Sequence, residues 1–215
     1  MLSIFLDLLF PRVCIGCGRS GTTLCAICER TIVSQPTTLP DGTAALFDYR
    51  NPLVKKIIWR LKFHADRAMG TYLGVALYRE FFRDLLSLPD HQRMPIVLVP
   101  IPLSRRKMFR KPFNHAEVIA RTIEEYALAD SLPVVVNTHI LQKVRETKSQ
   151  VETIGKEERI ANIANAFRAE ISQKERDSTF VVIDDVVTTG ATMCEAKRAL
   201  REAGARRVLC LAVAH

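Results

Sequence analysis

The sequence predicts an α/β fold with a largely parallel central sheet, preceded by a small cysteine-rich module. From residue 43 onward, short apolar runs alternate with longer stretches of helical hydrophobic period, a pattern typical of parallel strands joined by crossover helices. The first 40 residues instead hold four of the six cysteines and end in a turn-rich stretch with Pro36, Pro40 and Gly42. We therefore expect a module over residues 1–40 and a larger domain over residues 41–215.

Each element of the larger domain follows from its local pattern. Short apolar runs predict strands, and apolar residues that recur every three or four positions predict helices. The predicted strands span residues 43–49, 96–101, 133–137, 180–183 and 208–213. The predicted helices span residues 52–63, 71–88, 114–128, 156–167 and 190–203. Asn114 is a plausible N-cap for the third of these helices, and the polar, basic stretch 141–154 is predicted to be a loop that acts as a lid.

Composition limits the function classes. With 215 residues, 48% hydrophobic and 25% charged, the chain is typical of globular proteins, which excludes disordered, collagen-like and coiled-coil classes. A net charge of +8 favours anionic partners such as phosphates or nucleic acid. The apolar run 2–10 is too short to span a membrane, carries Asp7 and lacks a signal-peptide cleavage site. We expect a cytoplasmic protein without a transmembrane segment.

Two closely spaced cysteine pairs predict a metal site in the module. Two intervening residues within each pair let both thiolates converge on one ion, and the double pattern is a strong signal for zinc. With four thiolate ligands the site should be structural, since no position remains open for a substrate. In a reducing compartment the alternative, four cysteines used as small core residues, is less favoured than metal binding. The expected ligands are Cys14, Cys17, Cys25 and Cys28.

The main chemical motif lies after the predicted strand 180–183. Two carboxylates, Asp184 and Asp185, follow the strand, and a Thr-Thr-Gly turn then leads into a helix. Ligands of open α/β sheets bind at the carboxyl ends of strands, and a helix N-terminus can accept a phosphate. A Walker B strand is the alternative, but no Walker A loop occurs in the chain, and a plain helix cap would explain only one acid and one threonine. The groups expected to line the phosphate site belong to Val187, Thr188, Thr189, Gly190, Ala191 and Thr192.

This motif resembles the phosphoribosyl pyrophosphate loop of type I phosphoribosyltransferases. The resemblance implies that Asp184 and Asp185 are catalytic residues that bind the ribose hydroxyls, with Mg²⁺ as the cofactor, and that residues 187–192 hold the 5′-phosphate. The second buried strand, 96–101, is followed by a short turn with Leu103 and Ser104, which could hold the diphosphate that leaves during transfer. In the lid, Arg145 and Lys148 could stabilise that departing charge.

A basic cluster without acids follows the second strand. Such a cluster could bind diphosphate or the phosphates of single-stranded DNA, although most of its side chains could simply form a solvated face. Aromatic residues make up only 7% of the chain, and no aromatic stacking platform of the kind found in single-strand binders is expected. The cluster consists of Arg105, Arg106, Lys107, Arg110 and Lys111.

Several further motifs occur in order along the chain and, with the cysteine module and the acid-pair loop, resemble the ComF family, ComFC in particular. They are Leu61-Lys62-Phe63, Val99-Pro100-Ile101-Pro102-Leu103, Phe113-Asn114, Arg145-x-Thr147-x-x-Gln150, Arg159-x-x-Asn162 and Ala166-Phe167. The resemblance implies a type I phosphoribosyltransferase-like fold with a zinc module and an association with natural transformation, where imported single-stranded DNA is handled at the inner face of the membrane. One departure is Lys111-Pro112, where relatives commonly have Arg-Gly, and proline there removes a backbone donor.

Three hypotheses of function follow. The first is a phosphoribosyltransferase that uses phosphoribosyl pyrophosphate, Mg²⁺ and an unidentified acceptor. The second is a catalytically inactive accessory protein that binds single-stranded DNA and partner competence proteins, and it is compatible with retention of the phosphoribosyl site. In the third, apolar residues of the module form a docking surface for a partner such as a DNA helicase. The alternative, which the composition favours, is that they cover the module's own core.

Overall fold

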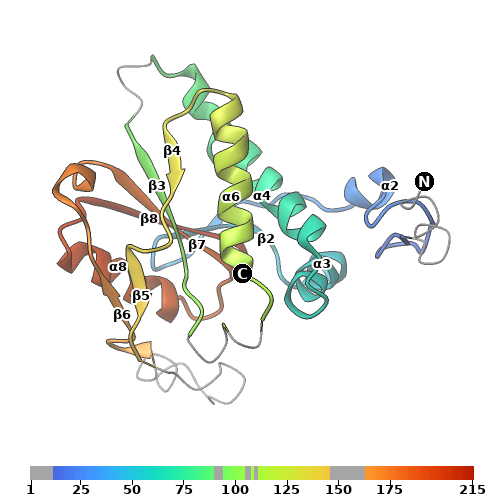
Figure 1. Ribbon diagram of the computed structural model, residues 1–215. Helices are drawn as coiled ribbons and strands as arrows, with labels where there is room; N and C mark the ends of the chain where they lie inside the picture. Colours follow the sequence, from blue (N-terminus) through green and yellow to red (C-terminus); the bar gives the residue numbers. More distant parts are fainter. Residues whose placement is uncertain (1–11, 90–93, 105–107, 109–110, 146–162) are drawn as a thin grey trace.

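A six-stranded sheet forms the centre of the computed structural model, which describes residues 12–89, 94–104, 108, 111–145 and 163–215 (Figure 1). Its strand order is β1-β2-β8-β7-β3-β4. Only β1, which pairs with β2, is antiparallel among the described strands of this sheet, so the predicted largely parallel α/β fold is confirmed. The strands are β1 (Thr37–Thr38), β2 (Thr43–Phe47), β3 (Ile96–Pro100), β4 (Val134–Val136), β7 (Thr179–Val186) and β8 (Arg207–Ala214).

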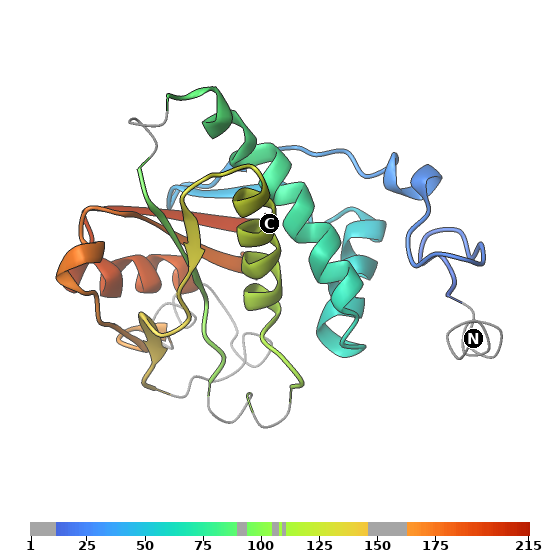
Figure 2. The ribbon, with the colours of Figure 1, turned by 45° about the horizontal axis from the view of Figure 1, so that its top comes forward.

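Helices cover both faces of the sheet (Figures 1 and 2). Helices α4 (Arg67–Phe81) and α6 (His115–Ala129) pack on one face, and α3 (Pro52–Phe63) packs beside α4. The other face is covered by α8 (Ala191–Glu202) and by a small antiparallel sheet of β5 (Leu141–Lys143) and β6 (Phe167–Ala169). The remaining described helices are short: α2 (Ala26–Glu29), η1 (Arg83–Ser87) and η3 (Gln173–Glu175).

Strand β7 lies between β8 and β3 and is buried on both faces. Val181 and Ile183 pack into the core beneath α4 and α6, whereas Phe180 and Val182 pack into the core beneath α8. Because successive side chains of a strand point to opposite faces, the two acids that follow are also separated. The side chain of Asp185 therefore lies on the face of the sheet that α6 covers, with Val181 and Ile183. The side chain of Asp184 lies on the face that α8 covers, with Phe180 and Val182.

Most predicted elements are present, and two predictions differ from the structure. The stretch 141–154 was predicted to be a loop, but Leu141–Lys143 form strand β5, because they pair with β6. A helix was predicted over residues 156–167, of which residues 156–162 lie outside the described part of the chain. The last predicted residue, Phe167, is not helical but begins strand β6. The helix predicted over 71–88 begins earlier, at Arg67, and ends at Phe81. The N-cap at Asn114 is confirmed, since its Oδ1 accepts a hydrogen bond from the Ala116 N–H at 3.1 Å. Its Nδ2 donates to the Ile101 carbonyl at 2.9 Å, which fixes the start of α6 to the end of β3.

The apolar run at residues 2–10 lies outside the part of the chain that the structure describes. Within the described ranges, every helix is too short or too polar to cross a bilayer. Strand β1 precedes the boundary predicted at residue 40 and is paired with the central sheet.

Candidate functional site

The four cysteines of the module converge on one point, as their spacing predicts. The Sγ atoms of Cys14, Cys17, Cys25 and Cys28 all lie within 4.8 Å of one another. The Sγ atoms of Cys17 and Cys25 are 3.7 Å apart, and tetrahedral zinc with Zn–S bonds of about 2.3 Å requires a sulfur separation of about 3.8 Å. The cluster therefore fits a metal ion such as zinc.

Local backbone features shape this cluster. A Cβ on Gly16 would lie 2.6 Å from the Cys28 Sγ, so only glycine lets the chain turn this close to the thiols. The backbone N–H of Cys25 donates to the Cys14 Sγ at 3.4 Å. Backbone hydrogen bonds from Cys17 and Cys25 lower the pKa of Cys14, whereas burial raises the pKa of Cys28. A bound cation would take the place of the proton on the Cys28 thiol.

A second group of charged side chains gathers at the carboxyl end of β7. Asp185 is 8% exposed, and its Oδ1 accepts from the Lys62 Nζ at 2.8 Å. The Nδ1 of buried His115 lies 3.7 Å from the other oxygen of Asp185. Lys62 belongs to α3 and His115 begins α6, so Asp185 links three elements. Asp184 is half-buried, and its Oδ1 accepts from the backbone N–H of Asp185 at 2.8 Å.

The pKa values of these groups follow from burial and from their neighbours. Burial and the adjacent charge of Asp185 raise the pKa of Asp184 to about 7. Burial lowers the pKa of Lys62, but the carboxylate of Asp185 outweighs burial and the net shift is upward. Burial and the positive charge of Lys111 lower the pKa of His115 to about 4, so its imidazole is neutral at pH 7. The site thus holds one paired carboxylate and one carboxyl group that ionises near neutral pH.

Residues 187–190 connect β7 to α8, and together with the first two residues of α8 they enclose a small hollow. This segment is called the loop 187–192 below. Asp184 and residues 186–193 line this hollow, so the structure brings the half-buried acid together with the predicted phosphate loop. Gly190 has a φ of 75°, which side chains with a Cβ rarely adopt. A Cβ at this position would also lie 2.2 Å from the Asp41 Oδ2.

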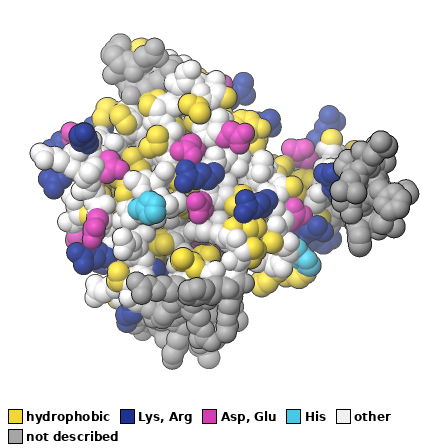
Figure 3. Space-filling model, in the orientation of Figure 1, with side chains coloured by type: hydrophobic (Ala, Val, Ile, Leu, Met, Phe, Trp, Pro, Cys, Tyr) yellow, Lys and Arg dark blue, Asp and Glu magenta, His cyan; other side chains and the backbone are white. Residues whose placement is uncertain are grey.

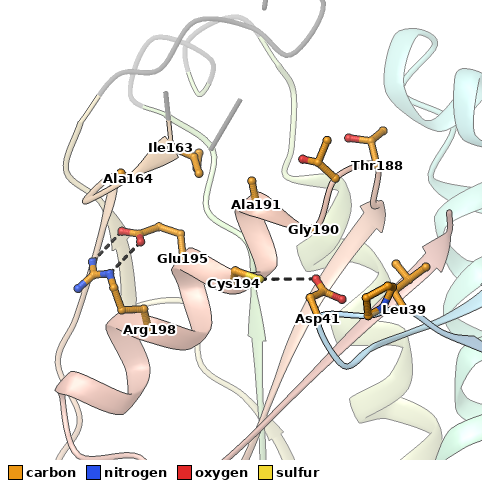
Figure 4. Close-up of a pocket in the computed structure, with 12 residues that line it drawn as sticks. Leu39, Asp41, Ile163, Ala164, Thr188, Gly190, Ala191, Cys194, Glu195 and Arg198 are labelled. Carbon is orange, nitrogen blue, oxygen red and sulfur yellow. Dashed lines mark hydrogen bonds and ion pairs between the residues drawn. The ribbon is translucent and has the colours of Figure 1, made fainter. Parts of the chain in front are cut away.

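A cavity of about 770 Å³ opens on the outer side of the same loop (Figure 4). Its walls come from Leu39 to Asp41, from Ile163 and Ala164, from residues 188–190, and from α8. Asp41 accepts hydrogen bonds from the backbone N–H and the hydroxyl of Thr43 at 3.0 and 2.9 Å, and the Cys194 Sγ lies 3.8 Å from its Oδ2. This volume is within the range that holds small organic ligands.

The other predicted site residues are only partly described. Leu103 is half-buried and Ser104 is buried at the end of β3. The Arg145 Nη2 donates to the Ala164 carbonyl at 2.6 Å, beside the cavity rather than beside Asp185. Lys111 lies close enough to lower the pKa of His115. Residues Arg105, Arg106, Lys107, Arg110 and Lys148 lie outside the described part of the chain.

Known proteins match this chain over most of its length. The profile of the phosphoribosyl transferase domain matches residues 123–215, which contain β7, the loop 187–192 and α8. Competence protein F of Haemophilus influenzae is 26% identical over 200 residues, which cover 89% of this chain and 81% of that protein. The DNA utilization protein YhgH of Escherichia coli is 28% identical, with 91% and 81% covered. Competence protein ComFC of Bacillus subtilis is 27% identical, with 90% and 73% covered.

The chain is similar to competence protein F, YhgH and ComFC over most of its length, and residues 123–215 match the phosphoribosyl transferase domain. It combines a phosphoribosyltransferase domain on a mostly parallel sheet with a cluster of four cysteines. Two residues of the charged group at β7, Lys62 and His115, were not predicted as site residues. Lys62 lies in the Leu61-Lys62-Phe63 motif that signals the ComF family, but nothing in its local pattern indicates a carboxylate partner. His115 follows the N-cap of a helix that begins after β3, and that position at the binding edge of the sheet is a signal that could have identified it.

Replacement of one cluster thiol should abolish metal binding. We expect Cys14→Ser to lower the zinc content from about one equivalent to near zero, because a structural site needs all four ligands. The melting temperature should fall as well. Cys194→Ser, which removes an exposed thiol outside the cluster, is the matched control. Elemental analysis and thermal unfolding measure both effects, and a full equivalent of zinc in Cys14→Ser would contradict this assignment.

The raised pKa of Asp184 has a measurable effect on stability. A carboxyl group whose pKa rises on folding binds more protons in the folded state, so stability falls as pH rises from about 4, the unfolded value, to about 7. Asp184→Asn removes this effect, and the variant should gain stability relative to the wild type over that range, by up to about 4 kcal/mol. Urea unfolding at several pH values measures the difference. Asp177→Asn, which removes an exposed carboxylate, is the control, and a difference for Asp184→Asn that stays flat with pH would contradict the shift.

Proposed function

We propose that this protein binds phosphoribosyl pyrophosphate with Mg²⁺ at the carboxyl end of β7 and transfers the phosphoribosyl group to an acceptor. The observation that carries the proposal is the shared hollow of Asp184 and the loop 187–192, within the segment that matches the phosphoribosyl transferase domain. A carboxyl group that ionises near neutral pH suits ribose hydroxyls or a hydrated Mg²⁺. The backbone N–H groups at the start of α8 and the nearby threonine hydroxyls suit a phosphate.

In this proposal the two acids have different roles. Asp184, on the accessible side, contacts the ribose hydroxyls. Asp185 is buried and paired with Lys62, so it holds the end of β7 in position and contributes to ribose binding through that geometry. His115 is neutral at pH 7 and adds no charge that would compete with Lys62 for Asp185.

The proposed reaction breaks the bond between C1 of the ribose and the diphosphate oxygen, and a bond from the acceptor to C1 replaces it. The diphosphate leaves with the electron pair, and the acceptor loses a proton. Negative charge accumulates on the leaving group, so Mg²⁺, when bound, and nearby cations would stabilise it. We propose that residues Leu103, Ser104, Arg145 and Lys148 contact the diphosphate, as the sequence predicts.

Titration calorimetry tests this binding site. We expect the wild type to bind phosphoribosyl pyrophosphate in the presence of Mg²⁺, and Asp184→Asn to weaken binding by about 10- to 100-fold, because a charged hydrogen-bond partner is lost. The double variant Asp184→Asn with Asp185→Asn should lose detectable binding. Asp177→Asn, an exposed acid paired with Arg206, should bind as the wild type does. Equal affinity of the wild type and Asp184→Asn would overturn the proposal.

We also propose that the protein acts in natural transformation and handles single-stranded DNA. The names of its relatives support this role, since they include competence protein F and a DNA utilization protein. The net charge of +8 supports it as well, because basic proteins gain affinity for nucleic acid when phosphates release their counterions. This role does not require catalysis and is compatible with a working phosphoribosyl site.

The salt dependence of DNA binding tests the role of the predicted basic cluster. With about five phosphate contacts, affinity for an oligothymidylate should fall by about 100-fold between 50 and 200 mM salt. Replacing Arg105, Arg106 and Lys107 by alanine should reduce this dependence. Lys174→Ala, at an exposed position on η3, is the matched control. Fluorescence anisotropy measures both affinities, and an affinity that does not change with salt would count against phosphate contacts.

A further inference from the structure

Helix α3 carries a cluster of aromatic rings on its solvent-facing side. Trp59 is 53% exposed and Phe63 is 68% exposed. The centroids of their rings are 5.8 Å apart, and the centroids of the Trp59 and His64 rings are 4.5 Å apart. These three side chains, called the aromatic cluster below, form a continuous surface of rings. The low aromatic content of the chain did not indicate this grouping of exposed rings.

The Trp59 and Phe63 rings do not contribute to the packing of the core. The opposite side of α3 is fully buried through Val54, Ile57, Ile58 and Leu61, each at most 1% exposed. Trp59 and Phe63 are four positions apart, so they lie on one face of the helix, and that face points away from the core. Figure 3 shows hydrophobic side chains and a histidine together on the surface near the end of α3.

The surroundings of the aromatic cluster are basic. Helix α3 carries four basic residues and no acidic residue between Pro52 and Phe63. Lys55 and Lys56 are exposed on the turn before Trp59. The nearest acid along the chain, Asp66, is paired with Arg60, with its Oδ2 3.0 Å from an Arg60 nitrogen. The described surface around the rings thus combines aromatic faces with positive charge.

The aromatic cluster lies next to the candidate phosphoribosyl site. Lys62, which pairs with Asp185, directly precedes Phe63 on α3. On the other side of the turn between α3 and α4, the Arg67 guanidinium lies over the Phe113 ring at 4.8 Å. The site and the aromatic cluster therefore share the last turn of one helix, at the edge of the sheet where the strands end (Figure 1).

We propose that the aromatic cluster is a stacking platform for the bases of a single-stranded nucleic acid, with Lys55 and Lys56 contacting its phosphates. Rings stack on bases of any sequence and lysines bind phosphates, the combination used by proteins that bind single strands. A hydrophobic protein partner would instead match a patch without this concentration of cations. The proposal rests on the DNA-handling role proposed above and adds the surface that performs it.

Trp59 is the only tryptophan of the chain, so its fluorescence reports on this surface alone. The experiment titrates a labelled 20-nucleotide oligothymidylate into the zinc-loaded full chain, and follows label anisotropy for binding and Trp59 emission for stacking. We expect the oligothymidylate to quench Trp59. An abasic oligomer of the same length, which keeps the phosphates and lacks the bases, should leave the emission unchanged.

Variants separate stacking from charge. Trp59→Ala and Phe63→Ala should each weaken oligothymidylate binding by about 5- to 100-fold, given the usual contribution of one stacked base, and should leave affinity for the abasic oligomer unchanged. Trp59→Phe should restore most of the affinity. Leu128→Ala, at a 73% exposed apolar position on α6, is the matched control and should bind as the wild type does.

Each other outcome overturns the proposal in an identifiable way. The oligothymidylate could bind while Trp59 emission stays constant and both alanine variants keep the affinity of the wild type. The aromatic cluster would then not be the binding surface, and the protein would bind DNA through another surface. An equal loss of affinity for the oligothymidylate and the abasic oligomer would mean that the rings do not contact bases. Absence of any DNA binding by the wild type would overturn both this inference and the DNA-handling role.

Discussion

The ion pair between Lys62 and Asp185 organises the edge of the sheet at which β7 ends. It joins α3 to the carboxyl end of β7, and His115 at the start of α6 packs against the same carboxylate. A buried ion pair contributes little net stability, because desolvation offsets much of the attraction, but loss of one partner leaves an uncompensated buried charge. The pair therefore acts chiefly as a constraint on geometry. It sets where α3 ends relative to the strand that carries the acids.

The same constraint explains the unusual state of Asp184. With Asp185 held as a paired carboxylate, its neighbour is partly buried beside a negative charge, and its pKa rises to about 7. The ionised form of such a carboxyl group is unfavourable in the unliganded protein, and a ligand that brings hydroxyl donors or a cation would stabilise it. Functional sites commonly retain destabilising arrangements of this kind, because binding depends on them.

Helix α3 contacts the cysteine cluster and the charged group at the end of β7, and it carries the aromatic cluster. Its N-terminal part packs against the cysteine cluster through Leu53, and the Lys56 Nζ lies 3.5 Å from the Ile15 carbonyl of the module. Its C-terminal turn carries Lys62 toward the site, with the aromatic cluster on the outer face. A metal ion in the cluster would fix the module through its four thiolates. Helix α3 thus lies in contact with the module at one end and with the charged group of β7 at the other.

The sequence alone determined the features that depend on neighbours along the chain. Hydrophobic period and turn residues predicted the parallel α/β sheet, the spacing of the cysteines predicted their convergence, and the Asp-Asp and Thr-Thr-Gly residues predicted the loop at the end of β7. These patterns are local, because the period of a helix or strand and the reach of a short loop are set by backbone geometry. The prediction failed at Phe167, where pairing with β5 overrides a helical pattern.

Only the tertiary structure decided which distant groups meet. Lys62, His115 and Asp185 lie on three separate elements, and their contact depends on how helices pack on the sheet, which no local pattern encodes. Strand alternation alone separates Asp184 from Asp185, but which of the two lies beneath α4 and α6 and which beneath α8 depends on how the helices pack on the sheet. The exposure of Trp59 and Phe63 depended likewise on which side of α3 faces the core. Apolar residues occur on both sides of α3, so the sequence does not show which side is buried. Tertiary packing decides this, because burial of one side requires a partner surface from elsewhere in the chain.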